Sequence, residues 1–430
     1  MLAFRSPLNV SRFSLNVQYY IMKLLQINPV VRVSTSTGRI MQEVGELAME
    51  NGWESYIAYS YGRDGEKPCA SELVPVGNRL SVAWHGIVTR LTDRHGLSSD
   101  SATRAFIERI KEIKPDIVHI HNIHGYFLNY KLLFDFLSKS GIPVVWTVHD
   151  CWLYTGHCYY YSFVQCDKWQ RGCGNCPQRA AFPASWFVDR SARNYCDKKA
   201  AFTSMPKDKL TIVPVSQWIG GELKKSFLAD YPIRVIHNGI DLDVFKVYDA
   251  AEVRERYSLG NRKILLGVAS IWSREKGLDD FIKMNALLND DEVIVLVGVD
   301  EKTRKQLPEG IVAIERTENI GQLAQLYSAA EAFVNPTWQD NYPTVNLEAI
   351  ACGTPVVTYR TGGSIEAVTE DTGAIVEQGD VEGLLTAVRA VASKGKGFYQ
   401  PKCREHAVKN FCKHDRYADY IRLYDELLRR

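Results

Sequence analysis

The feature that most constrains this chain is an alternation of short β-branched runs with amphipathic runs, which occurs in two successive series. The strand-like runs of the first series lie at residues 23–27, 55–59, 116–121, 143–148, 210–215 and 234–236. Those of the second series lie at residues 264–268, 293–297, 311–314, 332–334 and 356–358. Strands that alternate with helices form parallel sheets covered on both faces, so we predict an α/β protein with two doubly wound parallel-sheet domains.

The limits of the two domains follow from the positions of the two series. Residues 1–21 contain two arginines, no acidic residue and no apolar run of signal-peptide length, so we expect a leader outside the fold. The first domain is expected to span residues 22–246, with a cysteine-rich insert at 151–178. The second is expected to span residues 247–405, and residues 406–430 belong to a final helical run that begins at residue 403.

The composition argues against several classes of protein. The 430 residues are 46% hydrophobic and 24% charged, with a formal net charge of +2, which gives no basis for nucleic-acid binding. No run of 18 or more apolar residues occurs, so we expect no membrane-spanning helix. Since no secretory signal is evident, we expect a cytoplasmic, reducing location, in which disulfides are not the default for the ten cysteines.

The stretch 335–363 has the pattern of a ligand-binding strand-loop-helix-strand unit. Parallel sheets bind ligands in the loops at the carboxyl ends of their strands, and this loop carries Asp340, eight positions before Glu348 in the helical run. The N-terminus of a helix favours a diphosphate, and a nearby carboxylate can accept two hydrogen bonds from a ribose. The alternative is a solvated loop acid followed by a glutamate that the helix dipole favours.

The whole string resembles the acid-x7-acid signature of retaining glycosyltransferases of family 4, which have the GT-B fold. Asp340 stands at the first acidic place and Glu348 at the second, and the rest of the signature matches Ala349, Gly353, Pro355 and Val356. The sequence departs from the signature in having Asp instead of Glu at the first place. The resemblance covers residues 22–430 and implies two Rossmann-like domains that face each other across a cleft, with residues 406–430 returning to the N-terminal domain.

The resemblance also implies roles for residues of the second domain. Glu348 is expected to hold the ribose, Asp340 to lie near the sugar, and Lys276 to hold the donor diphosphate. The start of the helix is expected to complete the diphosphate site, through Asn341, Pro343 and Thr344.

One cation of the family pattern is missing in this chain. The family has an arginine six residues before the lysine, where this chain has Ser270, and Arg274 is the nearby substitute. The alternative is that residues 273–277 form a solvated basic loop.

Two further residues are candidates in the first domain, which is expected to bind the acceptor. His149 ends a strand-like run at the ligand-binding edge, where the family has a histidine that touches the donor sugar or its phosphate. Gly38 ends a small-residue loop, residues 34–38, whose backbone can approach a sugar or phosphate. Structural roles are the alternatives for both residues.

The cysteines of the insert have the spacing of a metal site. Cys158, Cys166, Cys173 and Cys176 follow the pattern C-x7-C-x6-C-x2-C, and structural zinc sites take four such ligands in a tetrahedron. Cys151 and His157 are spare candidate ligands. We expect one structural zinc ion that orders a loop too long to be ordered by its own core, and the alternative is four free thiols packed in an aromatic insert.

The resemblance implies a retaining glycosyltransferase with no catalytic metal. It would move a sugar from a nucleotide-diphosphate sugar to a hydroxyl of a glycan or lipid-linked acceptor, in surface polysaccharide biosynthesis at the cytoplasmic face of a membrane. Residues 218–228 form either a basic amphipathic membrane contact or an ordinary surface helix. The alternative functions are a GT-B nucleotide-sugar epimerase and a non-catalytic nucleotide-sugar-binding subunit.

Overall fold

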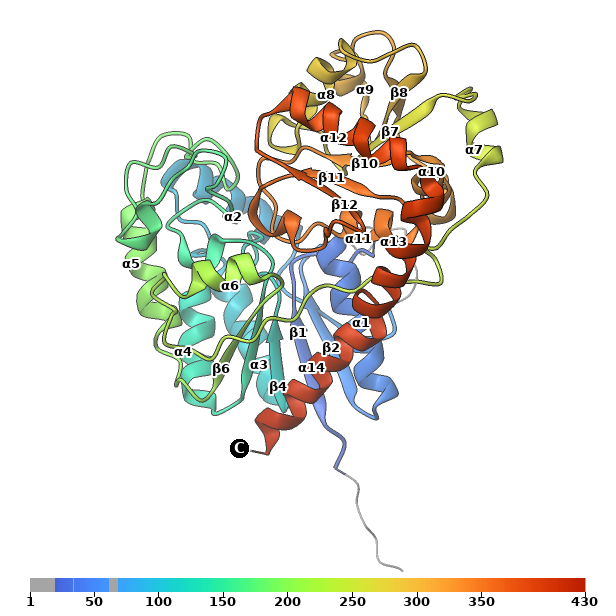
Figure 1. Cartoon of the computed structure of the whole chain (residues 1–430). Coiled ribbons are helices and arrows are strands. Elements are labelled where there is room, and N and C mark those ends of the chain that lie inside the picture. The colour runs from blue at the N-terminus through green and yellow to red at the C-terminus, as the bar shows by residue number, and fades with distance from the viewer. Residues whose placement is uncertain (1–19, 34, 62–68, 430) are drawn as a thin grey trace, which may run out of the picture.

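The computed structural model describes residues 20–33, 35–61 and 69–429, which form two α/β domains (Figure 1). The predicted leader therefore lies outside the described residues except for residues 20 and 21. Each domain is built on a six-stranded sheet, and every strand pair in both sheets is parallel. The predicted architecture of two doubly wound parallel sheets is confirmed.

The first sheet has the strand order β3-β2-β1-β4-β5-β6. Its strands are β1 (Lys23–Ile27), β2 (Glu54–Tyr59), β3 (Glu72–Pro75), β4 (Ile117–Ile120), β5 (Val144–Val148) and β6 (Leu210–Pro214). Its helices are α1 (Ser36–Glu50), α2 (Arg79–Thr92), α3 (Asp100–Ile113), α4 (Tyr130–Ser140), α5 (Ser191–Phe202) and α6 (Gln217–Leu223). The central strands β4 and β5 are buried along their whole length, as expected where helices cover both faces.

The second sheet repeats this order as β12-β11-β10-β7-β8-β9. Its strands are β7 (Lys263–Val268), β8 (Glu292–Val297), β9 (Val312–Ile314), β10 (Ala332–Asn335), β11 (Val356–Tyr359) and β12 (Gly373–Val376). Its helices are α7 (Ala251–Arg256), α8 (Leu278–Asn285), α9 (Glu301–Arg304), α10 (Ile320–Ala329), α11 (Thr344–Ala351) and α12 (Val381–Lys394). The strand order reverses direction between β1 and β4 and between β7 and β10, and such switch points are where doubly wound sheets bind ligands.

The structure corrects the sequence at the C-terminus. The helix predicted from residue 403 onward is two helices, α13 (Lys396–Asn410) and α14 (Lys413–Leu428). They separate because the backbone between them pairs with Ile240, whose N–H donates to the Phe411 carbonyl at 2.8 Å. The Ile240 carbonyl in turn accepts from the Lys413 N–H at 3.1 Å. A second correction concerns residues 234–236, which form no strand, whereas the short strands β3 and β12 were not predicted.

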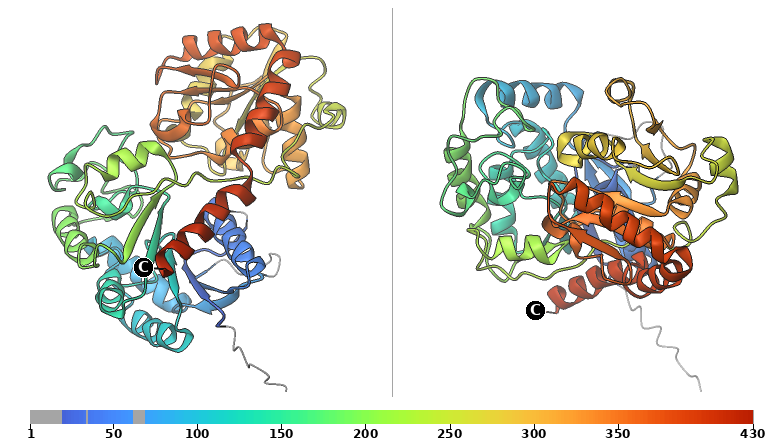
Figure 2. Two further views of the ribbon diagram at one scale, coloured as in Figure 1. Left: turned by 60° about the horizontal axis from the view of Figure 1, so that its bottom comes forward. Right: turned by 45° about the horizontal axis from the view of Figure 1, so that its top comes forward.

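Helix α14 packs against the first domain although it follows the second in the chain (Figures 1 and 2). It buries Tyr417, Tyr420 and Tyr424 beside residues of β1 and α1. The Tyr424 hydroxyl lies 2.7 Å from His119 Nδ1, and the Thr147 hydroxyl donates to the Tyr420 hydroxyl at 3.0 Å. The helix therefore fixes the second domain to the first through buried polar contacts as well as apolar packing.

The close approach of residue 239 to α14 gives the first testable prediction. A Cβ atom at Gly239 would lie 2.4 Å from the Lys413 Cα atom, so Gly239→Ala should force the two segments apart. We expect the free energy of unfolding to fall by about 1–3 kcal/mol, the usual cost of overpacking, as measured by urea denaturation. Gly221→Ala in α6 is the matched control, since a Cβ atom there meets no atom within 4 Å. Equal unfolding midpoints for Gly239→Ala and wild type would contradict this contact.

Candidate active site

The carboxyl ends of the two sheets enclose a cavity of about 290 Å³ between the domains. The first domain contributes Ser36, Thr37, His149, Tyr160, Val215 and Asn238 to its lining. The second contributes residues after β7, among them Ser270 and Lys276, and the segment from Asp340 to Val345 after β10. A larger hollow of about 510 Å³ lies on the helical surface between α3 and α4, away from the strand ends, so we take the interdomain cavity as the site.

Lys276 and Asp340 form an ion pair at the wall of this cavity. The Lys276 Nζ atom lies 2.6 Å from Asp340 Oδ2, so the shorter aspartate side chain reaches the lysine. The two loops are held together by Gly277, which has φ of 76° and where a Cβ atom would lie 2.3 Å from the Pro336 carbonyl oxygen. Only glycine accommodates both conditions, so the backbone fixes this pair before any ligand binds.

Asn341 joins the same loop to the first domain. Its Nδ2 atom donates to the carbonyl oxygens of Val148 at 3.2 Å and His149 at 3.1 Å, and its Oδ1 atom accepts from the Ser216 hydroxyl. Because Asn341 is buried, each of these hydrogen bonds replaces one that water would otherwise supply. Asn341 therefore links the two domains, and both polar atoms of its side-chain amide are hydrogen-bonded.

The start of α11 faces the cavity. Pro343, Thr344 and Val345 line it, and no side chain in the described part of the chain caps this helix. The first N–H groups of a helix have no partner within the helix, and they carry a partial positive charge. This end of α11 is therefore an anion-binding surface at the cavity wall.

Glu348 lies one helical turn deeper than Thr344 and is 4% exposed. Its Oε1 atom lies 3.3 Å from Arg39 of α1, and its Oε2 atom accepts from the Tyr327 hydroxyl at 3.1 Å. The Arg39 contact crosses from one domain to the other. Sequence reasoning did not single out Arg39 or Tyr327, because neither is near Glu348 in the chain.

His149, which is partly buried, lies next to a buried imidazole, His121. Its Nε2 atom lies 3.1 Å from His121 Nδ1, and the two rings are stacked with centroids 5.4 Å apart. His121 Nε2 lies 3.1 Å from Gln26 Oε1, so these contacts continue from the cavity into the core. Burial lowers the pKa of His149 to about 4, although the charge of Asp150 acts in the opposite direction. His149 is therefore neutral at neutral pH.

Three predicted residues do not line the cavity: Glu348, which is described above, Arg274 and Gly38. The Arg274 side chain is 76% exposed, and its Nε atom donates to Asp279 at 3.0 Å. Gly38 lies inside α1, where its N–H donates to the Thr35 hydroxyl at 3.3 Å and a Cβ atom would lie 2.2 Å from the Arg32 carbonyl oxygen. Gly38 is thus a packing position, and its neighbours Ser36 and Thr37 reach the cavity instead.

The predicted zinc ligands lie elsewhere in the first domain. Cys158, Cys166, Cys173 and Cys176 line a separate small cavity together with His157, and all ten cysteines are free thiols. Over the described ranges, no three His, Cys, Asp or Glu side chains are grouped so as to hold a metal ion.

Comparison with known families identifies the class of protein that this fold and site define. Residues 38–244 match the family described as Glycosyltransferase Family 4, and residues 262–394 match the one described as Glycosyl transferases group 1. Together the two matches cover most of the chain. The chain belongs to this glycosyltransferase family and is a glycosyltransferase, as the acidic signature predicted.

Individual relatives agree with this assignment. The chain is 24% identical over 371 residues to the putative colanic acid biosynthesis glycosyl transferase WcaC of Escherichia coli K12, covering 84% of this chain and 88% of the relative. Its fold is similar to that of sucrose-phosphate synthase from Thermosynechococcus elongatus, with a TM-score of 0.69 at 16% identity, covering 94% and 99% of the two chains. It is also similar to Anabaena Alr3699/HepE in complex with UDP-glucose, with a TM-score of 0.65 at 13% identity, covering 94% and 100%. The predicted GT-B fold is confirmed.

Two histidines of the first domain predict that the protein loses stability in mild acid. Burial lowers the pKa of His149 to about 4 and that of His119 to about 3, whereas an unfolded histidine has a pKa near 6.5. Below about pH 6.5 the unfolded chain therefore binds protons that these folded residues do not. Above about pH 6.5, we expect these histidines to leave the free energy of unfolding unchanged. Below about pH 6.5, each histidine should lower the free energy of unfolding by up to about 1.4 kcal/mol per pH unit.

Urea denaturation between about pH 7.5 and about pH 5.5 measures this loss, because the range spans the unfolded pKa but stays above that of most carboxylates. His149→Gln should lose stability less steeply than wild type as the pH falls. His414→Gln, at an exposed position of α14, should keep the wild-type slope. A wild-type stability that is flat across this range would show that these histidines are not held neutral.

Proposed function

We propose that this protein is a retaining glycosyltransferase that moves a sugar from a nucleotide-diphosphate sugar to a hydroxyl of a glycan or lipid-linked acceptor. The observation that carries the proposal is the arrangement of Lys276, Asp340 and the uncapped start of α11 around one interdomain cavity. A cation, a carboxylate and free backbone N–H groups are what a diphosphate leaving group and a sugar hydroxyl require.

In this proposal Lys276 and α11 bind the diphosphate. As the bond to the sugar breaks, negative charge grows on the diphosphate, and a fixed ammonium and fixed N–H groups stabilise that charge without reorganising. Lys276 is well placed because its ammonium is already held by Asp340 at the cavity wall. Asp340 would then accept a hydrogen bond from the sugar on the side away from the lysine.

Glu348 is proposed to hold the ribose and to link donor binding to the position of the two domains. Its carboxylate is shared between Arg39 and Tyr327, so a ribose would have to join or displace the contact with Arg39, which is the longer of the two at 3.3 Å. Donor binding would in this way change an ion pair between the domains. Retention of configuration is proposed from family membership.

The acceptor is proposed to bind at the first domain, beside His149. As a neutral imidazole, His149 can exchange hydrogen bonds with a sugar hydroxyl, and Tyr160 lies beside it with its hydroxyl donating to the His149 carbonyl at 3.3 Å. The printed name of WcaC places that relative in colanic acid biosynthesis, and HepE was solved with UDP-glucose. These relatives support a nucleotide-sugar donor and a role in polysaccharide biosynthesis here.

The first test is incubation of the protein with a panel of nucleotide sugars, with and without glycan and lipid-linked acceptors. The proposal expects release of nucleoside diphosphate that depends on the acceptor, and a product with the anomeric configuration of the donor by NMR. Conversion of a donor sugar without acceptor would indicate an epimerase. Donor-dependent thermal stabilisation without turnover across the panel would indicate a binding subunit.

Lys276→Ala should lower the turnover number at saturating donor. Removing one preorganised electrostatic partner of a developing anion costs about 10²–10³-fold in turnover. Arg274→Ala is the matched control, since it removes a cation two residues away that is exposed and paired with Asp279. We expect that variant to stay within about threefold of wild type, because exposed ion pairs contribute little energy. Equal losses in the two variants would contradict the role of Lys276.

A membrane surface is proposed as the second partner, through a face of the first domain that we call the α2 face. It consists of eight of the seventeen exposed large hydrophobic side chains of the described residues. They are Leu80, Trp84, Ile87 and Leu91 on α2, and Phe182, Trp186, Phe187 and Val188 on the loop before α5. The Trp186 N–H donates to the Arg90 carbonyl at 2.7 Å, so helix and loop lie side by side.

The charge of α2 favours an anionic lipid surface. The helix carries Arg79 and Arg90 and no acidic residue, and the adjacent Arg94 is exposed while Asp93 is buried. A helix with an apolar stripe, tryptophan and arginines is the type that lies in the plane of a membrane interface. Among the helices of the described chain, none is long and apolar enough to cross a membrane.

The α2 face is connected to the cavity through aromatic contacts. The Phe182 ring lies 6.5 Å from the His124 ring, and His124 lies 2.7 Å from Asp150, the neighbour of His149. A lipid-linked sugar at this face would therefore be near the proposed acceptor site. By contrast, residues 218–228 make no such surface, because Ile219, Leu223 and Leu228 are buried in the first domain. Residues 218–223 belong to α6, and residues 224–228 form turns.

Sedimentation with lipid vesicles tests the α2 face. The protein should bind vesicles of phosphatidylcholine with phosphatidylglycerol more strongly than phosphatidylcholine alone, and less strongly as salt is added. The triple variant Leu80→Gln, Trp84→Gln, Ile87→Gln should bind at least about tenfold more weakly. It buries less apolar surface in the membrane, and the lost burial should reduce the binding free energy by more than about 1.4 kcal/mol. The control is Leu287→Gln with Phe398→Gln, two exposed apolar residues of the second domain. Unchanged binding by the triple variant would contradict the proposal.

A further inference from the structure

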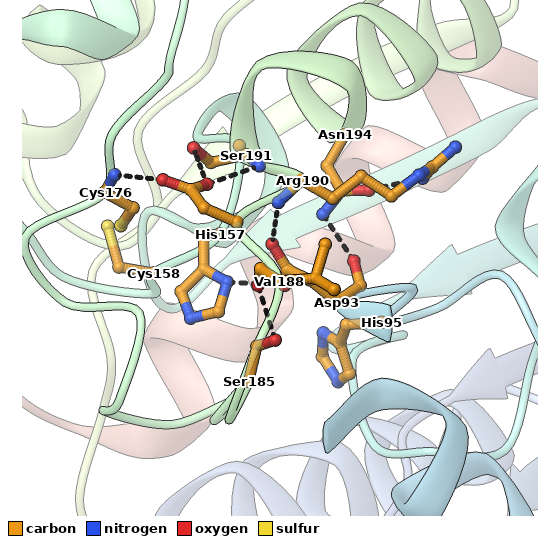
Figure 3. Close-up of polar contacts among 12 residues, drawn as sticks. Asp93, His95, His157, Cys158, Cys176, Ser185, Val188, Arg190, Ser191 and Asn194 are labelled. Carbon is orange, nitrogen blue, oxygen red and sulfur yellow. Dashed lines mark hydrogen bonds and ion pairs between the residues drawn. The ribbon is translucent and has the colours of Figure 1, made fainter. Parts of the chain in front are cut away.

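The cysteine-rich insert contains a small cavity in which the sulfur ligands of the sequence pattern meet a histidine. The cavity measures about 20 Å³ and is lined by His157, Cys158, Cys166, Cys173 and Cys176. A space of this size holds one particle of the size of a water molecule. Cys158 and Cys176 both line this cavity, and Figure 3 shows them beside the His157 ring.

His157 has a buried nitrogen without a partner. Its side chain is 1% exposed, and its Nε2 atom forms no hydrogen bond. A buried polar atom without a partner costs free energy, so such atoms are few in folded proteins and indicate a ligand when they face a cavity. The cavity wall to which His157 belongs is otherwise rich in thiols, which are soft metal ligands.

The other nitrogen of His157 is fixed by Asp93. Nδ1 lies 2.7 Å from Asp93 Oδ1, and the second carboxylate oxygen accepts from the Arg190 N–H at 2.7 Å (Figure 3). The Asp93 carbonyl accepts from Asn194 Nδ2 at 2.7 Å, so the fully buried aspartate is held on three sides. A carboxylate that accepts from one ring nitrogen of a histidine orients the other nitrogen toward a metal, and this arrangement is usual around protein-bound zinc.

A buried lysine, Lys198, lies near these thiols. Lys198 is 1% exposed, and its Nζ atom donates to the carbonyl oxygens of Trp152 at 2.6 Å and Thr155 at 3.0 Å. No carboxylate of residues 20–33, 35–61 or 69–429 forms an ion pair with it. Three thiolates and one neutral imidazole around Zn²⁺ carry a net charge of −1, which the nearby ammonium would balance.

We propose that this cavity is a structural zinc site whose ligands are the thiolates of Cys158, Cys173 and Cys176 and the Nε2 atom of His157. Asp93 orients the histidine, and Lys198 balances the charge. Relative to the set of four cysteines that the spacing predicted, His157 takes the place of Cys166. The thiols lie around the cavity without being grouped for coordination, so they have to close around the ion by side-chain rotation.

The zinc site would order a segment that contributes residues to the interdomain cavity and to the α2 face. Tyr160, which follows the first ligands, lines the interdomain cavity, and the loop that carries Trp186 and Phe187 follows Cys176. Cys176 is tied to the start of α5 through Asp189, which accepts from the Cys176 N–H at 2.6 Å. Zinc binding would therefore order residues of the insert without contacting donor or acceptor, and this inference does not depend on the proposed reaction.

Elemental analysis of untagged full-length protein, purified in the presence of zinc and a reductant, tests the proposal. We expect about one zinc ion per chain. His157→Gln and Cys176→Ser should each lose the zinc, whereas Cys196→Ser, an exposed cysteine outside the cavity, should keep it. Asp93→Asn should weaken zinc binding by about 10–100-fold in competition with a chelator, the usual effect of removing a carboxylate behind a zinc-bound histidine.

X-ray absorption spectroscopy of the zinc-loaded wild type keeps the proposal testable if a variant does not fold. Three sulfur ligands and one nitrogen would support it. Four sulfur ligands, or loss of zinc by Cys166→Ser with retention by His157→Gln, would overturn the assignment of His157. Protein that contains no zinc after purification and takes up none from solution would overturn the site altogether.

Discussion

The loop between β10 and α11 is the constraint on which the rest of the site depends. Its backbone is held on one side by Gly277 against Pro336 and on the other by Gly363, where a Cβ atom would lie 1.7 Å from the Asn341 carbonyl oxygen. Asn341 then joins this loop to β5 of the other domain. The two glycines let the backbone segments pack closely here. This packing fixes the positions of Asp340, Asn341 and the start of α11 relative to His149.

The charged groups of the site keep their contacts although two residues differ from the family signature. Aspartate at position 340 is shorter than the glutamate of the signature, yet it reaches Lys276 at 2.6 Å because the two loops are so close. Ser270 lines the cavity where the signature has arginine, and Arg274 faces solvent. The cavity thus has one lysine among its lining residues, and the helix start supplies the remaining positive potential.

The insert shows how a long loop is ordered in a first domain that already has a complete sheet. We expected it to lack a core of its own, but Tyr154, Tyr161 and Trp169 are buried together, with ring centroids 4.9–6.3 Å apart. Aromatic packing therefore orders part of the segment, and the cavity beside it collects the cysteines and His157. A zinc ion would then stabilise an insert that already has a partial core. Loss of the metal should lower the stability of the insert and shift its residues, but the insert should stay folded.

The sequence by itself determined the two parallel-sheet domains, because the period of two in strands and of 3.6 in helices is a local property of the chain. It also indicated Asp340 and Glu348 through a signature confined to one segment, and Lys276 through the resemblance to the family. It could not indicate Arg39, which meets Glu348 from 309 positions away, or the pairing of Asp93 with His157. It missed the break in the final helical run, since residues 411–412 have helical neighbours on both sides and their pairing with Ile240 is not visible in the sequence. Tertiary structure decided these contacts, because they depend on how the two domains and the insert pack. Packing brings together residues that are far apart in the chain, and no periodic pattern in the sequence connects them.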